Sequence, residues 1–71
     1  MKDKIQNSIK DRRKSAGLTQ EEVAKAMGVS RQTIISIEKG KYIPSLPLAL
    51  KIARFFHCST DEMFELEEDV I

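Results

Sequence analysis

The sequence predicts an all-α fold of five short helices. Apolar residues recur every three or four positions, Ser or Thr precedes four of the helical stretches, and Gly follows three of them. Ser and Thr side chains cap the free amides at a helix start, and Gly readily takes the left-handed conformation at a helix end. The length of 71 residues predicts one domain over residues 1–71. Its core should run from about residue 7 to 66, between a short N-terminal arm and an acidic C-terminal tail.

The first predicted helix runs from about residue 7 to 16, and Gly17 ends it. Residues 1–7 have no clear period and fit a frayed end, an extension of this helix or a short strand. The second helix follows Thr19, with Glu22 three positions later. This spacing is typical of a capping box, in which the Thr hydroxyl and the Glu carboxylate each accept a backbone N–H of the other residue.

Ser30 caps the third predicted helix, which ends near Lys39, before Gly40. At about 100° per residue, Ile34 and Ile37 take the core side. An ordinary solvated helix would carry Glu and Lys on the opposite side. Here that side carries mainly Gln, Ser, Thr and Arg, whose side chains are able to hydrogen-bond to base edges in the major groove of DNA.

The fourth predicted helix begins after Ser45 and is the most hydrophobic, so we expect it to be the central helix of the core. Its apolar residues are Leu46, Leu48, Leu50, Ile52, Ala53 and Phe56. It should end at or just before His57. Ser59 and Glu62 repeat the capping-box spacing at the start of a short fifth helix. The remaining residues, 65–71, fit a last helical turn, a strand or a disordered end.

Residues 19–38 therefore hold two capped helices with Gly28 at the corner between them. This pattern is typical of a helix-turn-helix, which places its second helix in the DNA major groove. Residues 1–42 carry a formal charge of +5 and residues 43–71 a charge of −4. Such asymmetry suits a protein with one face toward a polyanion. Charge alone, however, favours the simpler interpretation that these side chains only solvate the helices.

Several protein classes are disfavoured. The single cysteine, Cys58, excludes an intramolecular disulfide and the usual cysteine zinc sites. We expect it to be a small, buried apolar residue. No apolar run approaches the roughly 20 residues that span a bilayer. We therefore expect a cytoplasmic protein with no membrane partner, no cofactor and no metal. His57 has no second ligand or nucleophile at a useful spacing, and no catalytic set stands out, so an enzyme is not expected.

Four segments together resemble the phage repressor and Cro family of helix-turn-helix regulators, also called xenobiotic-response-element regulators. They are GLTQEEVA at 17–24, GVSRQTI at 28–34, IEKGKYIPS at 37–45 and LKIARFF at 50–56. Each motif alone is modest, but their order and spacing are specific, and the resemblance covers about residues 9–64. It is closest to minimal members of the family that have a single DNA-binding domain, and it implies five helices with the second and third as the reading unit.

The resemblance also implies roles for individual residues. The positions expected to face the bases are Arg31, Gln32, Thr33, Ile35 and Ser36, with a phosphate contact equally open for Arg31. The positions expected to contact phosphates are Gln20, Ser30, Lys39, Lys41 and Tyr42. Arg13 and Glu38 match a structural ion pair between the first and third helices. A dimer interface, or simply a core edge, is open for Phe64, Leu66, Val70 and Ile71.

Three residues depart from the family pattern. Arg12 stands where many relatives have Leu on the first helix. Ile35 takes an exposed position that is often polar, where it could meet a thymine methyl group or lie beside the groove. His57 replaces the common Gly after the fourth helix and is therefore predicted to adopt a positive φ.

The sequence thus predicts a sequence-specific transcriptional regulator of double-stranded DNA, and specifically a repressor that binds a roughly palindromic operator as a homodimer. The alternative is the antitoxin of a toxin–antitoxin pair, whose main task would be to mask a protein partner. The acidic tail favours that alternative.

Overall fold

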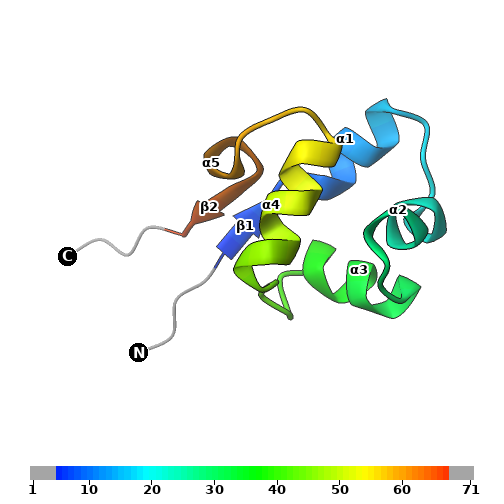
Figure 1. Ribbon diagram of the computed structural model, residues 1–71. Coiled ribbons are helices and arrows are strands. Elements are labelled where there is room, and N and C mark those ends of the chain that lie inside the picture. Colours follow the sequence, from blue (N-terminus) through cyan, green and yellow to red (C-terminus); the bar gives the residue numbers. More distant parts are fainter. Residues whose placement is uncertain (1–4, 68–71) are drawn as a thin grey trace.

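Five helices and two short strands make up residues 5–67, the part of the chain described by the computed structural model (Figure 1). Their order is β1 (Ile5–Asn7), α1 (Ile9–Ser15), α2 (Gln20–Met27), α3 (Arg31–Glu38), α4 (Leu46–Phe55), α5 (Thr60–Met63) and β2 (Phe64–Leu66). The predicted five helices are confirmed, and the strands add a small sheet to the all-α class. Within residues 5–67, no helix has both the length and the apolar content needed to cross a bilayer.

The predicted caps form because each depends only on residues within one helical turn. Thr19 and Glu22 make the expected capping box, with bonds of 3.1 Å to the hydroxyl and 2.8 Å to the carboxylate. Ser59 and Glu62 make the second one, again at 3.1 and 2.8 Å. The Ser30 hydroxyl accepts the N–H of the third residue of α3 in the same way. These bonds fix where the helices begin.

The helix ends are also set locally. Gly28 ends α2 with a φ of 75° and makes the corner before α3. His57 follows α4 with a φ of 58°, so its predicted positive φ is confirmed. A residue with a Cβ is strained in this left-handed region by roughly 1–2 kcal/mol. The chain after α4 therefore turns at a position that Gly would occupy without that cost.

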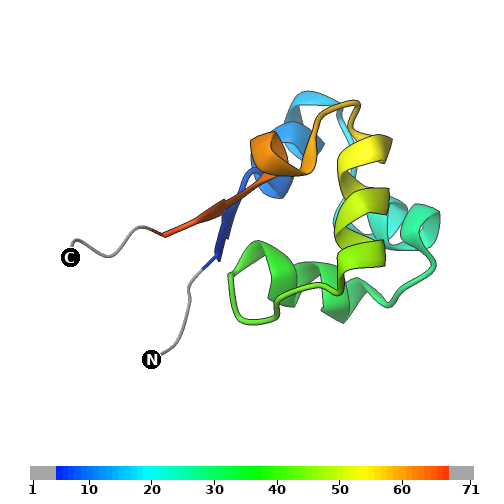
Figure 2. The same cartoon turned by 60° about the vertical axis from the view of Figure 1, so that its left-hand side comes forward.

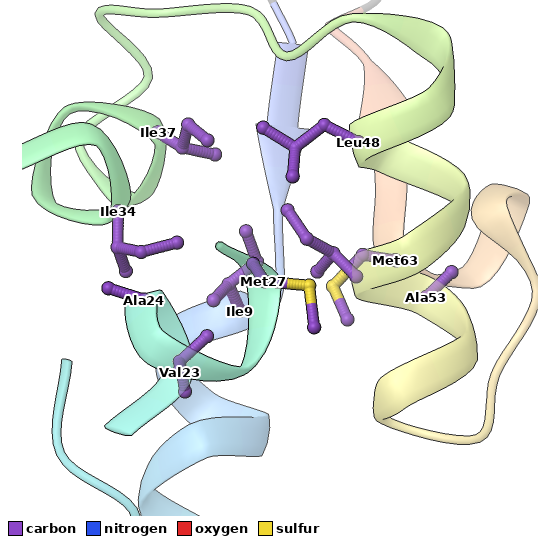
Figure 3. Close-up of a cluster of buried hydrophobic side chains, with 10 residues drawn as sticks. Ile9, Val23, Ala24, Met27, Ile34, Ile37, Leu48, Ala53 and Met63 are labelled. Atoms are coloured by element: carbon purple, nitrogen blue, oxygen red, sulfur yellow. The ribbon is translucent and has the colours of Figure 1, made fainter. Parts of the chain in front are cut away.

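The core is one cluster of buried apolar side chains between α4 on one side and α1, α2 and α3 on the other (Figure 3). Its members are Ile9, Val23, Ala24, Met27, Ile34, Ile37, Leu48, Ile52, Ala53 and Met63. Not all the apolar residues of α4 lie in this core, since Leu46 and Leu50 are 70% and 48% exposed. Each is about 200° around the helix from Leu48, so only one of the two sides faces inward.

The strands β1 and β2 pair antiparallel, with Ile5 opposite Leu66 and Asn7 opposite Phe64. Both views place this sheet at the end of the domain away from α2 (Figures 1 and 2). The prediction that the first helix starts near residue 7 is wrong by two residues, because Asn7 is in the strand and α1 begins at Ile9. Of the alternatives for the two ends, the strand is correct for residues 5–7 and 64–66.

Candidate nucleic-acid interface

The helices α2 and α3 pack closely because their contact uses a small residue. Ala24 is 3% exposed, and in Figure 3 its side chain lies beside that of Ile34, which is fully buried. The backbone N–H of Val29 donates to the carbonyl of Ala24 at 3.0 Å, which closes the corner between the helices. Their relative orientation is thus set by core packing and by one backbone turn.

The two sides of α3 differ sharply in burial. Ile34 and Ile37 are 0% and 1% exposed and anchor the helix in the core. Of the predicted base-facing residues, two are exposed, Arg31 and Gln32, and three are half-buried, Thr33, Ile35 and Ser36. The exposed residues lie in the first turn of α3.

The Thr33 hydroxyl is already engaged in the helix cap. It lies 2.8 Å from the Ser30 hydroxyl, which also accepts the backbone N–H of Thr33 at 3.1 Å. A base or phosphate contact by either hydroxyl would have to be made beside the hydrogen bond between Ser30 and Thr33, or replace it. The Gln32 amide is exposed, so of the polar side chains in this turn it and Arg31 are the most accessible to a groove.

The loop after α3 turns back against the helix. The carbonyl of Ser36 accepts the N–H of Lys41 at 2.9 Å and that of Tyr42 at 3.3 Å. Lys39, Lys41 and Tyr42 are all exposed. Three of the predicted phosphate contacts are therefore brought together at the C-terminal end of α3, while Ser30 lies at its N-terminal end.

The predicted ion pair between Arg13 and Glu38 is present and bidentate. Arg13 Nε donates to Glu38 Oε2 at 2.8 Å and Nη2 donates to Oε1 at 3.2 Å, with side chains only 10% and 5% exposed. Arg13 Nη1 also donates to the carbonyl of Leu18 at 3.0 Å. The hydrogen bond that Arg13 donates to Glu38 raises the pKa of Arg13 above its ordinary value, against the opposing effect of burial. The guanidinium therefore stays charged and joins α1 to the end of α3.

Gln20 adds a contact that the sequence did not predict. Its Nε2 donates to Glu38 Oε1 at 3.1 Å, so the side chain expected to contact phosphate is tied to the ion pair. A primary amide has two N–H donors, and one bond to Glu38 leaves the second for another acceptor. The first residue of α2 is thus oriented by the last residue of α3.

One residue of this unit escaped the sequence analysis. Asn7 Nδ2 donates to the carbonyl of Ile37, in α3, at 2.8 Å. The only signal in the sequence was an Asn just before a helix, a position that ordinarily indicates a local cap. The partner lies 30 residues away, so spacing alone could not have identified it.

The predicted dimer residues are only partly described. Phe64 is half-buried and packs against the core cluster, and Leu66 is 63% exposed on the sheet. Val70 and Ile71 lie outside the described residues. In the region from residue 5 to 67, no three His, Cys, Asp or Glu residues gather in a way that could hold a metal ion.

Comparison with known proteins places this geometry in a family. The helix-turn-helix family signature matches residues 9–63. An uncharacterized HTH-type transcriptional regulator of Methanocaldococcus jannaschii is 55% identical over 65 residues, which cover 92% of this chain and 98% of the relative. The transcriptional repressor RstR of the cryptic phage CTXphi in Vibrio cholerae is 40% identical over 50 residues, which cover 70% of this chain and 45% of that protein.

The solved structures agree with these sequence matches. The restriction-modification controller protein C.AhdI from Aeromonas hydrophila superposes with a TM-score of 0.69 at 30% identity, over 76% of this chain and 82% of that one. The family and these relatives are regulators rather than enzymes. The chain belongs to the helix-turn-helix family of phage repressor and Cro type, and it is a DNA-binding transcriptional regulator.

Proposed function

We propose that this protein is a cytoplasmic repressor that binds a roughly palindromic operator in double-stranded DNA as a homodimer. The observation that carries the proposal is the exposed polar face at the start of α3, Arg31 and Gln32, on a helix anchored by two buried Ile residues. The similarity of this chain to the phage repressor RstR supports repression as its effect on transcription. Occupancy of an operator would block RNA polymerase, with α3 as the recognition helix.

The recognition helix would read bases with its exposed first turn. Gln32 suits a bidentate pair with adenine, and Arg31 suits guanine or a phosphate, each pair contributing on the order of 1–3 kcal/mol of discrimination. Ser36 and Thr33 lie farther back and would reach bases only where the helix enters deeply. Ile35 would meet a thymine methyl group.

The phosphate contacts would flank this helix. Lys39, Lys41 and Tyr42 would hold the strand at its C-terminal end, and Ser30 would do so at its N-terminal end. Gln20 would use its second amide N–H, because Glu38 already accepts the first. Such contacts fix the register of the protein on the duplex without carrying sequence information.

The dimer would place the two recognition helices about 34 Å apart, one turn of the duplex. The proposed interface comprises Phe64, Leu66, Val70 and Ile71. The 63% exposure of Leu66 supports it, since a large apolar side chain on a strand gains stability when a partner covers it. Dimer formation would also add stability to a domain of only 71 residues.

The direct test is selection of bound duplexes from a random DNA pool, with the oligomeric state measured by sedimentation on the same sample. We expect a palindromic consensus with half-sites one turn apart and a dimer in solution. A pool without a consensus would refute sequence-specific regulation, and an unsymmetrical consensus bound by a monomer would refute the dimer. Co-purification of a small basic protein that displaces the DNA would favour the antitoxin instead.

A further inference from the structure

Asn7 connects the terminal strand β1 to the recognition helix. Its Nδ2 donates to the carbonyl of Ile37 at 2.8 Å, and its Oδ1 accepts the backbone N–H of Ile9 at 3.2 Å. The first bond needs a donor and the second needs an acceptor, which a carboxamide provides together. The two bonds fix the orientation of the amide and join the start of α1 to the end of α3.

The carbonyl of Ile37 lies in the last turn of α3, where carbonyls have no partner farther along the helix. It accepts the N–H of Gly40 at 2.9 Å as well as the Asn7 amide. The next residue, Glu38, is held by Arg13 and Gln20. The C-terminal end of α3 is thus fixed by side chains from three other elements.

The N-terminal end of α3 is the end that would enter the groove. The helix is eight residues long, which is about 12 Å at 1.5 Å per residue. A tilt of about 5° at the fixed end would move the exposed first turn by roughly 1 Å over that length. A shift of this size spoils a bidentate hydrogen bond, whose donor–acceptor distance lies within a few tenths of an ångström.

The strand that carries Asn7 is itself held by the other end of the described chain. Asn7 is opposite Phe64 in the sheet, and the N–H of Ser8 donates to the carbonyl of Met63 at 3.0 Å. Met63 is 1% exposed and belongs to the core. A rigid path therefore runs from α5 and β2 through β1 to the last turn of α3.

We infer that Asn7 is a positioning residue for base recognition, which sets the angle of α3 through the carbonyl of Ile37. Pairing of residues 5–7 with 64–66 is then a condition for sequence-specific reading. This inference rests on the proposed function, because it assigns the role to a helix that reads bases. The contribution of Asn7 falls on discrimination between sequences, while the lysine contacts contribute equally on all sequences.

The test compares Asn7→Asp with Ser15→Asp. Both add one negative charge, but Ser15 is exposed at the last residue of α1 and takes no part in the hydrogen bonds of Asn7 to Ile9 and Ile37. The Asn7→Asp variant keeps the acceptor for Ile9 and loses the donor for Ile37. Asn7→Ser is the second variant, since its hydroxyl is able to cap α1 locally but is too short to reach Ile37.

The measured quantity is the ratio of dissociation constants on random and selected DNA at one salt concentration. We expect both Asn7 variants to lower this ratio by about five- to tenfold, the effect of one hydrogen bond. Ser15→Asp should change binding to both DNAs alike and keep the ratio. Circular dichroism confirms that each variant is folded at the assay temperature.

A second readout needs no DNA. The Gly40 amide donates to the same carbonyl as Asn7, so its NMR chemical shift should move in both Asn7 variants and stay unchanged in Ser15→Asp. Unmoved Gly40 shifts, or an unchanged ratio in the Asn7 variants, would overturn the positioning role alone. A wild-type protein that binds selected and random DNA equally would overturn the proposed function, and this inference with it.

Discussion

At the scale of single residues, Glu38 has the greatest influence on the reading unit. It ends α3, pairs with Arg13 of α1 and accepts the amide of Gln20 at the start of α2. Its side chain is only 5% exposed, and both partners donate hydrogen bonds to the carboxylate. One carboxylate thus orients three helices, and its loss leaves the Arg13 charge buried without its counter-ion.

The first prediction concerns this buried charge. Glu38→Gln should destabilise the domain by about 3–5 kcal/mol, because removal of one member of a buried ion pair strands the other. Glu21→Gln is the matched control, with the same change of charge at an exposed position. Urea unfolding followed by circular dichroism gives both free energies. Similar losses in the two variants would show that the pair contributes little.

The second prediction separates base contacts from phosphate contacts. Gln32→Ala should reduce binding to the selected site and leave random DNA unaffected, since its amide would read an adenine edge. Lys41→Ala should weaken binding to all sequences alike and lower the slope of affinity against salt by about one unit. Titrations at several salt concentrations measure both effects. Equal loss on both DNAs for Gln32→Ala would exclude it as a base reader.

At the scale of the elements, the caps show how local chemistry determines the helix starts. In the α5 cap, the backbone N–H of Ser59 and its hydroxyl lower the pKa of Glu62 below its ordinary value, with the backbone bond the larger cause. A lowered pKa means that the carboxylate is favoured in the folded protein. Its stabilising contribution is present above the ordinary pKa of 4.5 and is lost as the pH falls through the folded value.

The third prediction follows from the lowered pKa of Glu62. At neutral pH, wild-type protein should melt at a higher temperature than Glu62→Gln, because only the carboxylate benefits from the lowered pKa. The difference should shrink as the pH is lowered below 4.5 and vanish once Glu62 is protonated. Thermal melts of both proteins at each pH provide the measurement. A difference that is constant with pH would contradict the assignment to ionisation of Glu62.

The same locality explains which parts of the fold were predictable. The caps at Thr19 and Ser59 and the positive φ of His57 depend on residues within one turn, and they were predicted correctly. The pairing of Ile5 with Leu66 depends on residues about 60 positions apart, and strands of three residues have too little pattern to indicate it. Periodicity also could not choose between the two apolar sides of α4.

The contacts of the candidate site also divide into those that could be predicted from the sequence and those that could not. The resemblance identified Arg13 with Glu38, and the geometry confirms the contact. It did not predict that Gln20 would bond to Glu38, because no local signal links the ends of two helices. Asn7 was missed for a related reason, since its partner is a backbone carbonyl and any residue type supplies one.

At the scale of the whole molecule, the apolar surface that remains exposed bears on assembly. Leu46, Leu50 and Leu66 are each at least 48% exposed, although only Leu66 belongs to the proposed dimer interface. A substitution at each position therefore discriminates between a specific interface and general surface hydrophobicity.

The fourth prediction uses this contrast. Leu66→Glu should convert the dimer to a monomer and weaken operator binding by at least tenfold, because a charge buried in an apolar contact is costly without a partner. Leu50→Glu should leave the dimer intact, since it places the same charge at an exposed position on α4. Sedimentation at several protein concentrations measures the state. Dissociation by both variants alike would locate the interface elsewhere.

The sheet also has a consequence for the order in which the protein matures. A ribosome releases β1 early, but its partner β2 follows some 60 residues later, after every helix has emerged. Because Met63 belongs to the core and directly precedes β2, the core and the sheet are completed together by the last part of the described chain. If Asn7 positions α3 as proposed, discrimination between sequences begins only with that last step.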